Sequence, residues 1–403
     1  MTEGFSRSQP WMVVADRVMA NTYKRQPVVF TKGQGCTLWD ADGKSYLDFL
    51  AGIAVCNLGH AHPGIAAAVS RQAETLIHVS NLYYTTPQTE LAAWLVDHSF
   101  ADRVFFCNSG AEANEAAIKL ARKYFKDRGE PDRYRIISML QSFHGRTFGT
   151  LSATGQDKIK EGFSPILEGF DFAPFNDIDA VRNLISAKTC AILMEPVQGE
   201  GGIRAADPDY LRQVRELCDE TGTLLIFDEV QTGIGRTGKL FAHEHFGVTP
   251  DIMTLAKALA NGFPIGAMLS KESVAAAFVP GSHATTFGGT PIVTAAALCT
   301  LKTIESDNLL GHCREMGEYF KSKLTDLQSR HSVIKDVRGI GLLLGMELDT
   351  DGAPLVQACL EQGFVINCVQ GNILRFVPPL IIQKPEIDAL IACLDQMLKQ
   401  VIF

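Results

Sequence analysis

The chain has 403 residues, which is more than one hydrophobic core usually supports, so two or more domains are expected. With 46% hydrophobic and 20% charged residues and a net charge of −8, the composition is that of an ordinary globular protein and argues against nucleic acid as a partner. The sequence has no secretory signal and no apolar run of the ~20 residues that a membrane span needs, so we expect a cytoplasmic protein without membrane association. Its ten cysteines are scattered and form no Cys-x-x-Cys pair, so we expect reduced thiols and no metal site.

The first part of the chain predicts an entry segment followed by a hairpin. Helical spacing suggests a helix over residues 12–23. Apolar residues alternate on both sides of Asp42-Gly43, which predicts a β-hairpin over residues 28–49. Residues 52–62 mix Gly, Asn and His and are expected to form a loop before helices at 65–76 and 89–96.

A strand at residues 103–107 runs directly into a helix start. Ser109 is the expected N-cap, and Glu112 three residues later completes the pattern of a capping box. Gly110 allows close backbone approach. The N-terminus of such a helix is suited to phosphate, although the same pattern also fits an ordinary capped helix.

The next strand, at residues 135–139, is followed by an aromatic and a cationic residue. Phe143 is placed to stack on a flat ring, and Arg146 to bind a carboxylate through two hydrogen bonds. The alternative is a core phenylalanine and a surface arginine.

Three further strands end near chemically active residues. The strand at 190–195 ends in Glu195 and leads into a glycine-rich loop that contains Glu200. The buried strand at 224–228 ends in Asp228, and the strand at 251–255 is followed by Lys257. Asp228 and Lys257 fit the two ends of a pyridoxal phosphate site, in which an acid faces the pyridinium nitrogen and a lysine bonds the aldehyde. The simpler alternative is that Asp228 only ends a strand and that Lys257 reaches solvent.

The C-terminal part predicts a change of architecture. Strands and helices alternate from about 104 to 270, which indicates a parallel sheet with helices on both faces. Thr285 and Thr286 belong to a hydroxyl-rich turn that either binds phosphate or caps the helix expected at 292–304. Strands at 333–337 and 342–347 then suggest an α+β domain, in which Arg375 needs an anionic partner among its apolar neighbours.

Taken together, these motifs resemble the class III (ω-amino acid) family of pyridoxal phosphate aminotransferases from about Tyr23 to the last helix. The motifs that carry the resemblance are Asn108 to Asn114, Phe143 to Arg146, Glu195 to Glu200, Phe227 to Gln231, Lys257, and Thr285 to Gly289. The family implies a type I pyridoxal phosphate transferase fold of class α/β. Its large domain has a mainly parallel seven-stranded sheet flanked by helices, and a smaller α+β domain is built from both ends of the chain. On this basis we expect an N-terminal segment at 1–50, a large domain at 51–290 and a small domain at 291–403.

The resemblance also implies roles for individual residues. Lys257 and Asp228 are the expected catalytic residues, the first bonding the cofactor's aldehyde and moving protons, the second keeping the pyridine nitrogen protonated. The expected contacts to pyridoxal 5'-phosphate are Ser109, Gly110, Ala111, Phe143, Asp228, Glu229, Val230, Gln231, Lys257 and Thr286. Thr286 is expected to come from the other subunit of a homodimer with shared active sites.

The expected substrates follow from the same resemblance. It implies a ping-pong transaminase that moves the δ-amino group of N-acetylornithine to 2-oxoglutarate in arginine synthesis, with Arg146, Glu200, Thr285 and Arg375 as substrate contacts. Arg146 would bind the distal carboxylate, and Glu200 would pair with Arg375 until 2-oxoglutarate enters. Ile53 would offer an apolar wall to an acylated nitrogen. Alternatives are a succinylornithine, ornithine, 4-aminobutyrate or succinyldiaminopimelate transaminase, a racemase or aminomutase, or a catalytically silent cofactor-binding relative.

Overall fold

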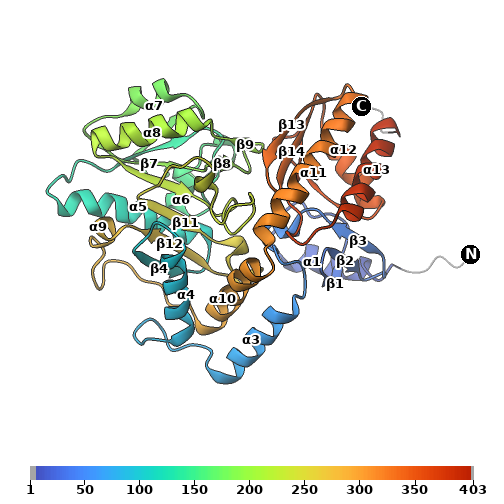
Figure 1. The fold of residues 1–403 in the computed structure, drawn as a ribbon, viewed down its shortest axis with the longest axis horizontal. Helices are drawn as coiled ribbons and strands as arrows, with labels where there is room; N and C mark the ends of the chain where they lie inside the picture. Colours follow the sequence, from blue (N-terminus) through green and yellow to red (C-terminus); the bar gives the residue numbers. More distant parts are fainter. Residues whose placement is uncertain (1–5, 401–403) are drawn as a thin grey trace, which may run out of the picture.

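The computed structural model describes residues 6–400 and has two lobes (Figure 1). One lobe is built on a seven-stranded sheet, and the other combines the C-terminal elements with the N-terminal strands. In the described range, no helix combines the length and the apolar character that crossing a membrane requires.

The seven-stranded sheet confirms the expected α/β architecture. From edge to edge its strands are β4 (Arg103–Cys107), β12 (Gly266–Ser270), β11 (Ile252–Leu255), β10 (Leu224–Asp228), β7 (Thr189–Met194), β5 (Arg135–Met139) and β6 (Phe170–Ala173). Only β12 runs against its neighbours, and the other pairings are parallel. Asp228 pairs in register with Thr254, so the ends of β10 and β11 meet at one edge of the sheet.

Helices on both faces explain why the central strands are apolar throughout. In β10, Leu224 and Ile226 pack toward α5 (Gly110–Asp127), whereas Leu225 and Phe227 pack toward α8 (Pro208–Thr221). Successive side chains of a strand point to opposite faces, so a strand that is covered on both sides has no polar face. The other elements of this lobe are α3 (Pro63–Thr75), α4 (Thr86–Asp97), α6 (Phe148–Ala153), η1 (Asp157–Ile159), α7 (Ile178–Leu184), β8 (Val197–Gln198), β9 (Arg204–Ala205), η2 (Ala242–His245), η3 (Lys257–Ala260) and α9 (Glu272–Ala275).

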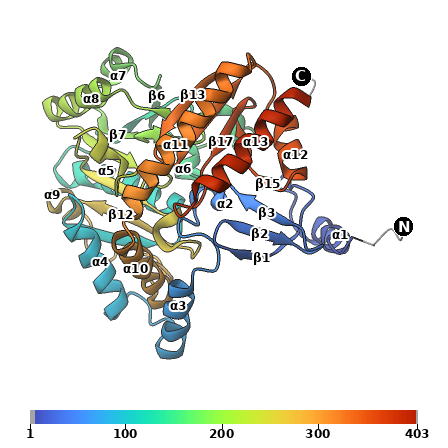
Figure 2. The same cartoon turned by 45° about the vertical axis from the view of Figure 1, so that its right-hand side comes forward.

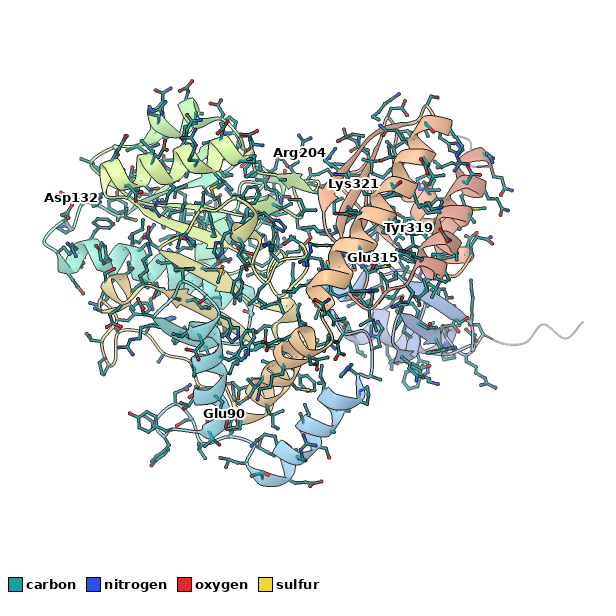
Figure 3. All side chains as sticks on the ribbon, viewed as in Figure 1. Glu90, Asp132, Arg204, Glu315, Tyr319 and Lys321 are labelled. Atoms are coloured by element: carbon teal, nitrogen blue, oxygen red, sulfur yellow. The ribbon has the colours of Figure 1, made fainter. Side chains whose placement is uncertain are left out.

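The second lobe contains an antiparallel sheet covered by helices. Its strands are β13 (Ile334–Ile340), β14 (Leu343–Leu348), β17 (Ile373–Phe376) and β16 (Asn367–Val369), and its helices are α11 (Leu309–Arg330), α12 (Ala353–Glu361) and α13 (Lys384–Gln400). Glu315 and Tyr319 on α11 reach α13, where they meet Lys384 and Asp388 (Figure 3). These contacts fasten the last helix of the chain to the lobe.

The N-terminal segment lies beside this second lobe (Figure 2). It consists of α1 (Gln9–Val18), β1 (Phe30–Gln34), β2 (Thr37–Asp40), β3 (Ser45–Asp48) and the short α2 (Ala51–Ala54). β3 pairs in parallel with β15 (Phe364–Val365), which ties the two ends of the chain together. The predicted hairpin is present, but the first helix ends at residue 18 and not at 23, because Met19 leaves the helical conformation.

The position of α10 (Pro291–Ser306) bears on the domain boundaries. Its buried side chains Val293, Ala297 and Leu301 belong to the same cluster as Leu91 and Leu255 of the large lobe. The predicted division at residues 50 and 290 stays a prediction, and we propose that the second boundary falls at the junction of α10 and α11.

Candidate active site

A cavity of about 420 Å³ opens at the edge where β10 and β11 end. The predicted site residues that line it are Ser109, Gly110, Ala111, Phe143, Arg146, Glu200, Asp228, Val230, Gln231 and Lys257. They come from five separate segments of the chain, and the fold brings them to one place. Glu229, Thr285, Thr286 and Arg375 do not line this cavity.

Asp228 lies at the floor of the cavity, and only 3% of its surface is exposed. Its Oδ2 lies 2.7 Å from Nδ1 of His144 and accepts a hydrogen bond of 2.7 Å from Nδ2 of Asn114. Its Oδ1 accepts a bond of 3.0 Å from the backbone N–H of Val230, and Asn114 is itself held by the hydroxyl of Thr254. Several donors thus hold this buried carboxylate in one place, which suits a protonated ring nitrogen.

Lys257 is the first residue of η3, directly after β11 and the bridging residue Ala256. Its φ of +45° lies in the left-handed region, which a side chain with a Cβ rarely adopts. Burial lowers the pKa of its amine to about 8, although nearby carboxylates, Glu200 first among them, act in the opposite direction. The neutral, nucleophilic amine is therefore within reach near neutral pH.

The start of α5 forms another wall of the cavity. The hydroxyl of Ser109 accepts a hydrogen bond of 3.2 Å from the backbone N–H of Glu112, as predicted for the N-cap. The second half of the predicted capping box is wrong, because the Glu112 carboxylate accepts from the N–H of Asn108 and not from that of Ser109. A Cβ on Gly110 would lie 2.7 Å from Cγ1 of Val230, so only glycine fits here. The first turn of α5, where the N–H groups of a helix lack helical partners, thus lines the cavity.

Phe143 and Arg146 lie on the loop between β5 and α6. The backbone N–H of Phe143 donates to Glu195 over 3.2 Å, and the same carboxylate accepts from the N–H of Gly199 over 3.2 Å. The guanidinium of Arg146 lies 5.7 Å from the centre of the Phe143 ring, and its side chain is exposed. An exposed cation at the rim of a cavity is available to an anionic substrate.

Glu200 and Arg375 form an ion pair beside the cavity. Arg375 is buried and also donates to Gln231 over 3.3 Å and to Asn367 over 3.2 Å, whereas 28% of the Glu200 side chain is exposed. Burial alone would raise the pKa of Glu200, but the charges of Arg375 and Lys257 outweigh it and lower the pKa below its ordinary value. The buried cation that the sequence indicated therefore has an internal anionic partner.

Glu229 faces another part of the lobe. Its carboxylate accepts hydrogen bonds from the N–H groups of Ala242 and His243 and from the hydroxyl of Thr232, and burial raises its pKa to about 7. These contacts fasten η2 to the end of β10. A direct contact between Glu229 and the cofactor stays a prediction that this arrangement does not support.

Thr285 and Thr286 lie outside the cavity, in a separate hollow that also contains Asn81. The hydroxyl of Thr285 accepts a hydrogen bond of 3.1 Å from Asn108, which does line the cavity. Thr286 is exposed. Within one chain, therefore, the structure brings Thr285 only to the border of the site and leaves Thr286 away from it.

Three polar residues of the site had no role in the sequence-based prediction. Asn114 and His144 support Asp228, and Glu195 joins the loops that carry Phe143 and Glu200. All three belong to motifs noted in the sequence, and Glu195 also ends a buried strand. Asn114 and His144 lie 114 and 84 residues from Asp228, and Glu195 lies 52 residues from Phe143, so the spacing alone could not reveal these contacts.

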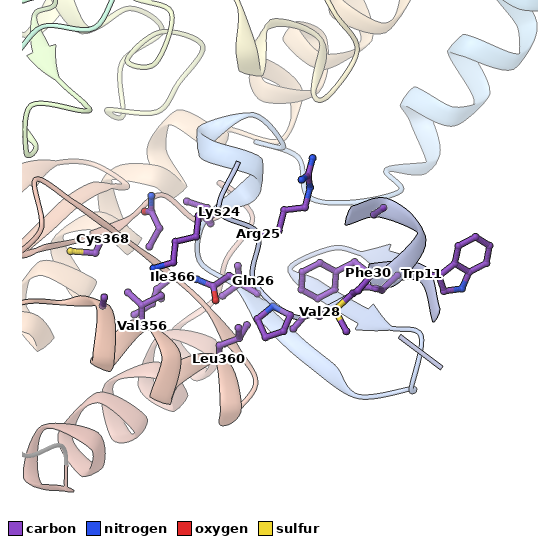
Figure 4. A pocket seen from close by; sticks show the side chains of 18 of the residues that line it. Trp11, Lys24, Arg25, Gln26, Val28, Phe30, Val356, Leu360, Ile366 and Cys368 are labelled. Atoms are coloured by element: carbon purple, nitrogen blue, oxygen red, sulfur yellow. The ribbon is translucent and has the colours of Figure 1, made fainter. Parts of the chain in front are cut away.

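A second, larger cavity of about 980 Å³ lies between α1, residues 24–30 and α12 (Figure 4). Its lining includes Trp11, Phe30, Val356 and Leu360 and is mostly apolar. None of the predicted site residues lines it. We therefore take the smaller cavity at the sheet edge as the candidate active site.

Fold and site together define a transferase of the type I pyridoxal phosphate fold. The class-III aminotransferase family matches residues 18–398, and the chain belongs to this family. Its cofactor is pyridoxal 5'-phosphate, so the predicted cofactor and fold class are confirmed.

Curated relatives match the chain over almost its whole length. The acetylornithine aminotransferase of Caldanaerobacter subterraneus subsp. tengcongensis is 52% identical, with 96% of this chain and 98% of the relative covered. That of Methanocaldococcus jannaschii is 53% identical, with 97% and 98% covered.

Solved structures give the same picture. The ornithine aminotransferase of Toxoplasma gondii superposes with a TM-score of 0.95 at 32% identity and covers 98% of this chain and 96% of its own. The acetylornithine aminotransferase of Elizabethkingia anophelis gives a TM-score of 0.88 at 32% identity, with 98% and 100% covered.

The residues present fit this cofactor. The start of α5 offers N–H groups to a phosphate, Asp228 offers a buried anion to the pyridine nitrogen, and Lys257 offers an amine to the aldehyde. Phe143 and Val230 line the same cavity and provide apolar surfaces for the two faces of a flat ring.

Proposed function

We propose that the chain transfers the δ-amino group of N-acetyl-L-ornithine to 2-oxoglutarate by a ping-pong mechanism, giving N-acetyl-L-glutamate 5-semialdehyde and L-glutamate. The single observation that carries the proposal is the match at 52% and 53% identity to proteins named acetylornithine aminotransferase. Among the solved structures, an ornithine aminotransferase and an acetylornithine aminotransferase match at the same identity of 32%, so the proposal depends on the curated relatives. The reaction belongs to arginine synthesis.

The residues of the cavity then have distinct tasks. When bound, the cofactor supplies an electron sink that stabilises negative charge on the carbon bearing the amino group. Lys257 removes the proton from this carbon and returns it to the cofactor carbon that takes up the nitrogen. Its lowered pKa supports this task. Asp228 keeps the ring nitrogen protonated through charge. Gln231 is proposed to donate a hydrogen bond near the ring hydroxyl.

Substrate recognition is proposed to depend on two arginines. Arg146 binds the carboxylate that lies far from the reacting carbon in both substrates. Arg375 binds the second carboxylate of 2-oxoglutarate, and Glu200 covers that charge while the neutral end of the amine donor is present. The partial exposure of Glu200 and the glycines on both sides of it support such a movement.

The acyl group is proposed to meet an apolar surface. Ile53 is 40% exposed and offers no hydrogen bond to a free α-amino group. Thr285 is proposed to contact the acetylated end of the donor. These contacts favour an acylated ornithine over free ornithine, since a buried amine without a partner is costly.

We also propose a homodimer in which Thr286 reaches the phosphate bound by the partner subunit. Large apolar side chains that are exposed in the single chain support this: Leu82 is 85% exposed, Tyr83 69% and Tyr84 99%. Patches of this kind usually mark interaction surfaces. A cytoplasmic location is proposed as well, supported by ten cysteines that form no disulfide.

Subunit mixing tests the role of Thr286. Neither Lys257→Ala nor Thr286→Ala is expected to be active at low cofactor concentration. A mixed dimer of the two contains one site with both native residues, so mixing and reassociation should restore activity. No restoration, with dimers demonstrated, would place Thr286 in its own subunit's site, and an active Thr286→Ala variant would place it outside both sites.

The substrate proposal is tested by comparing amine donors. Glutamate formation from 2-oxoglutarate should have a higher kcat/KM with N-acetylornithine than with ornithine or 4-aminobutyrate. N-succinylornithine is the closest competitor and belongs in the same assay. A preference for free ornithine would contradict the proposal, and transfer without any oxo acid would point to a different reaction class.

A further inference from the structure

Four consecutive residues next to the candidate active site have a left-handed backbone. The φ angles of the α2 residues Ala51, Gly52, Ile53 and Ala54 are +49°, +65°, +69° and +58°. Glycine adopts this conformation freely, but alanine and especially the β-branched Ile53 do not. Hydrogen bonds from Ala54 to Leu50 and from Val55 to Ala51 close one turn of left-handed helix. Such strain persists only where the surroundings enforce it, and it is concentrated at functional sites.

The carboxylate of Asp48 is the group that holds the start of this turn. It is 1% exposed, and its Oδ1 accepts hydrogen bonds of 2.8 Å from the backbone N–H groups of both Leu50 and Ala51. Its Oδ2 lies 2.7 Å from Nε2 of His60. The carboxylate thus accepts two backbone hydrogen bonds at the start of the turn and is itself held by the ring of His60.

His60 is in turn fixed to the N-terminal sheet. Its backbone exchanges two hydrogen bonds with Gly35, of 2.9 and 3.0 Å. The hydrogen bond to Asp48 is the main reason that the pKa of His60 is raised to about 10. The ring therefore remains protonated at neutral pH, and the contact with Asp48 is ionic.

The far side of the turn supports the substrate end of the cavity. Ala54 is buried in a cluster with Val197 and Val377. Val197 precedes Glu200 by three residues, and Val377 follows Arg375 by two. The next residue of the segment, Val55, lines the cavity itself. The turn thus lies behind both partners of the ion pair and continues into the cavity wall.

We propose that Asp48, together with His60, is a positioning residue of the active site, because it holds the left-handed turn 51–54 against the segments that carry Glu200 and Arg375. This inference rests on the proposed function of that pair in binding 2-oxoglutarate. Asp48 touches neither the cavity nor its lining charges, and it acts only through the backbone that it fixes. Without this carboxylate the turn can relax, and the segments that carry Glu200 and Arg375 then lose a surface against which they pack.

The test compares Asp48 with a matched aspartate of the same sheet. Asp40 is 8% exposed, and its carboxylate likewise accepts two backbone hydrogen bonds, from Asp42 and Lys44, and one from the hydroxyl of Tyr46. It has no contact with the turn or the cavity. Asp40→Ala therefore removes a comparable set of bonds without affecting the site.

Asp48→Ala should raise the KM for 2-oxoglutarate about tenfold or more, because small displacements of binding groups are costly. Asp48→Asn retains an acceptor oxygen but loses the ionic contact with His60, so a smaller rise is expected. In the cofactor-free protein, Asp48→Ala should also speed protease cleavage within residues 50–56. Asp40→Ala should lower Tm about as much as Asp48→Ala does, but it should change the KM for 2-oxoglutarate by less than about twofold.

The inference would be overturned if both Asp48 variants kept the native KM for 2-oxoglutarate and the native rate of cleavage within residues 50–56, while their Tm fell as in Asp40→Ala. If Asp48→Ala does not fold, the KM of Asp48→Asn decides. Failure of the proposed function has a different signature, because the native protein would then not transfer an amino group from N-acetylornithine at all.

Discussion

The two ends of the active-site cavity bind charge in different ways. At the floor, the carboxylate of Asp228 is 3% exposed and receives hydrogen bonds from α5, from the loop after β5 and from its own strand end. At the other end, Glu200 is partly exposed, and its main partner is the single cation Arg375. Asp228 has the same task with both substrates, and it is enclosed by several hydrogen-bond donors. Arg375 is needed for only one of the two substrates, and it is balanced by Glu200, a single partner that can move away.

The largest effect is expected for Lys257, which lies between the two ends. Lys257→Ala should lower kcat/KM about 10⁴-fold or more, because both the nucleophile and the proton carrier are lost. Lys257→Arg serves as a control that keeps a cation without a usable amine and should be similarly inactive. Activity of either variant within tenfold of the native protein would remove Lys257 from the proposed mechanism.

The fixed end is tested by Asp228→Asn. The amide occupies the same space but carries no charge, so kcat/KM should fall about 10³-fold, as for the loss of a preorganised electrostatic contact. His144→Gln and Asn114→Ala each remove one supporting contact of Asp228 and should cost much less, about tenfold. Equal losses in all three variants would show that charge at Asp228 is not the decisive property.

The exchangeable end is tested by Glu200→Ala. Arg375 is then permanently available, so kcat/KM for 2-oxoglutarate and for glutamate should rise about tenfold relative to N-acetylornithine, the size expected for one charge-assisted hydrogen bond. Steady-state kinetics with each substrate pair measure this ratio. Glu200→Gln keeps the shape without the charge and is the control. An unchanged ratio would contradict the exchange of partners.

The smallest effect is a pH-dependent change in stability. The pKa of Lys257 falls from 10.5 to about 8 on folding, so between these values the unfolded chain binds more protons and stability rises with pH. Below pH 8 the full penalty applies, at most about 3 kcal/mol for this difference in pKa. Lys257→Met should therefore stabilise the cofactor-free protein at pH 7 but not at pH 10.5.

Urea unfolding at both pH values measures this difference in free energy. Lys188→Met replaces an exposed lysine and should give the same small effect at both pH values. A Lys257→Met variant that is no more stable than the native protein at pH 7 would show that burial of this ammonium carries no penalty.

The strands and their acidic ends could be predicted from the sequence because both are local patterns. The apolar run before Asp228 and the strand before Lys257 indicate their own place at the edge of a parallel sheet. The antiparallel direction of β12 has no local signal, since its apolar residues read the same in either direction. The left-handed turn at 51–54 could not be predicted, because Ile53 and its alanine neighbours disfavour this conformation. It is supported by the contact of Asp48 with His60 and by the packing of Ala54 against Val197 and Val377, which lie far away in the sequence.

The site shows the same division between local and distant information. Ser109 and Gly110 follow from the strand-to-helix junction, whereas the contacts of His144 and Asn114 with Asp228 join residues 84 and 114 positions apart. Glu229 illustrates the opposite case. It is adjacent to Asp228 in the sequence, but the end of the strand directs its carboxylate to the backbone of Ala242 and His243.

The most direct test of the account is the visible spectrum of the cofactor-loaded protein on addition of N-acetylornithine without any oxo acid. The account predicts that the absorbance band of the bound cofactor falls as the amino group is taken up, and that 2-oxoglutarate then restores the band and yields glutamate. A loaded protein whose spectrum does not respond to N-acetylornithine, while ornithine or 4-aminobutyrate changes it, would contradict the proposed donor. A protein that shows no band with pyridoxal phosphate present would contradict the assignment of Lys257 and Asp228 to the cofactor.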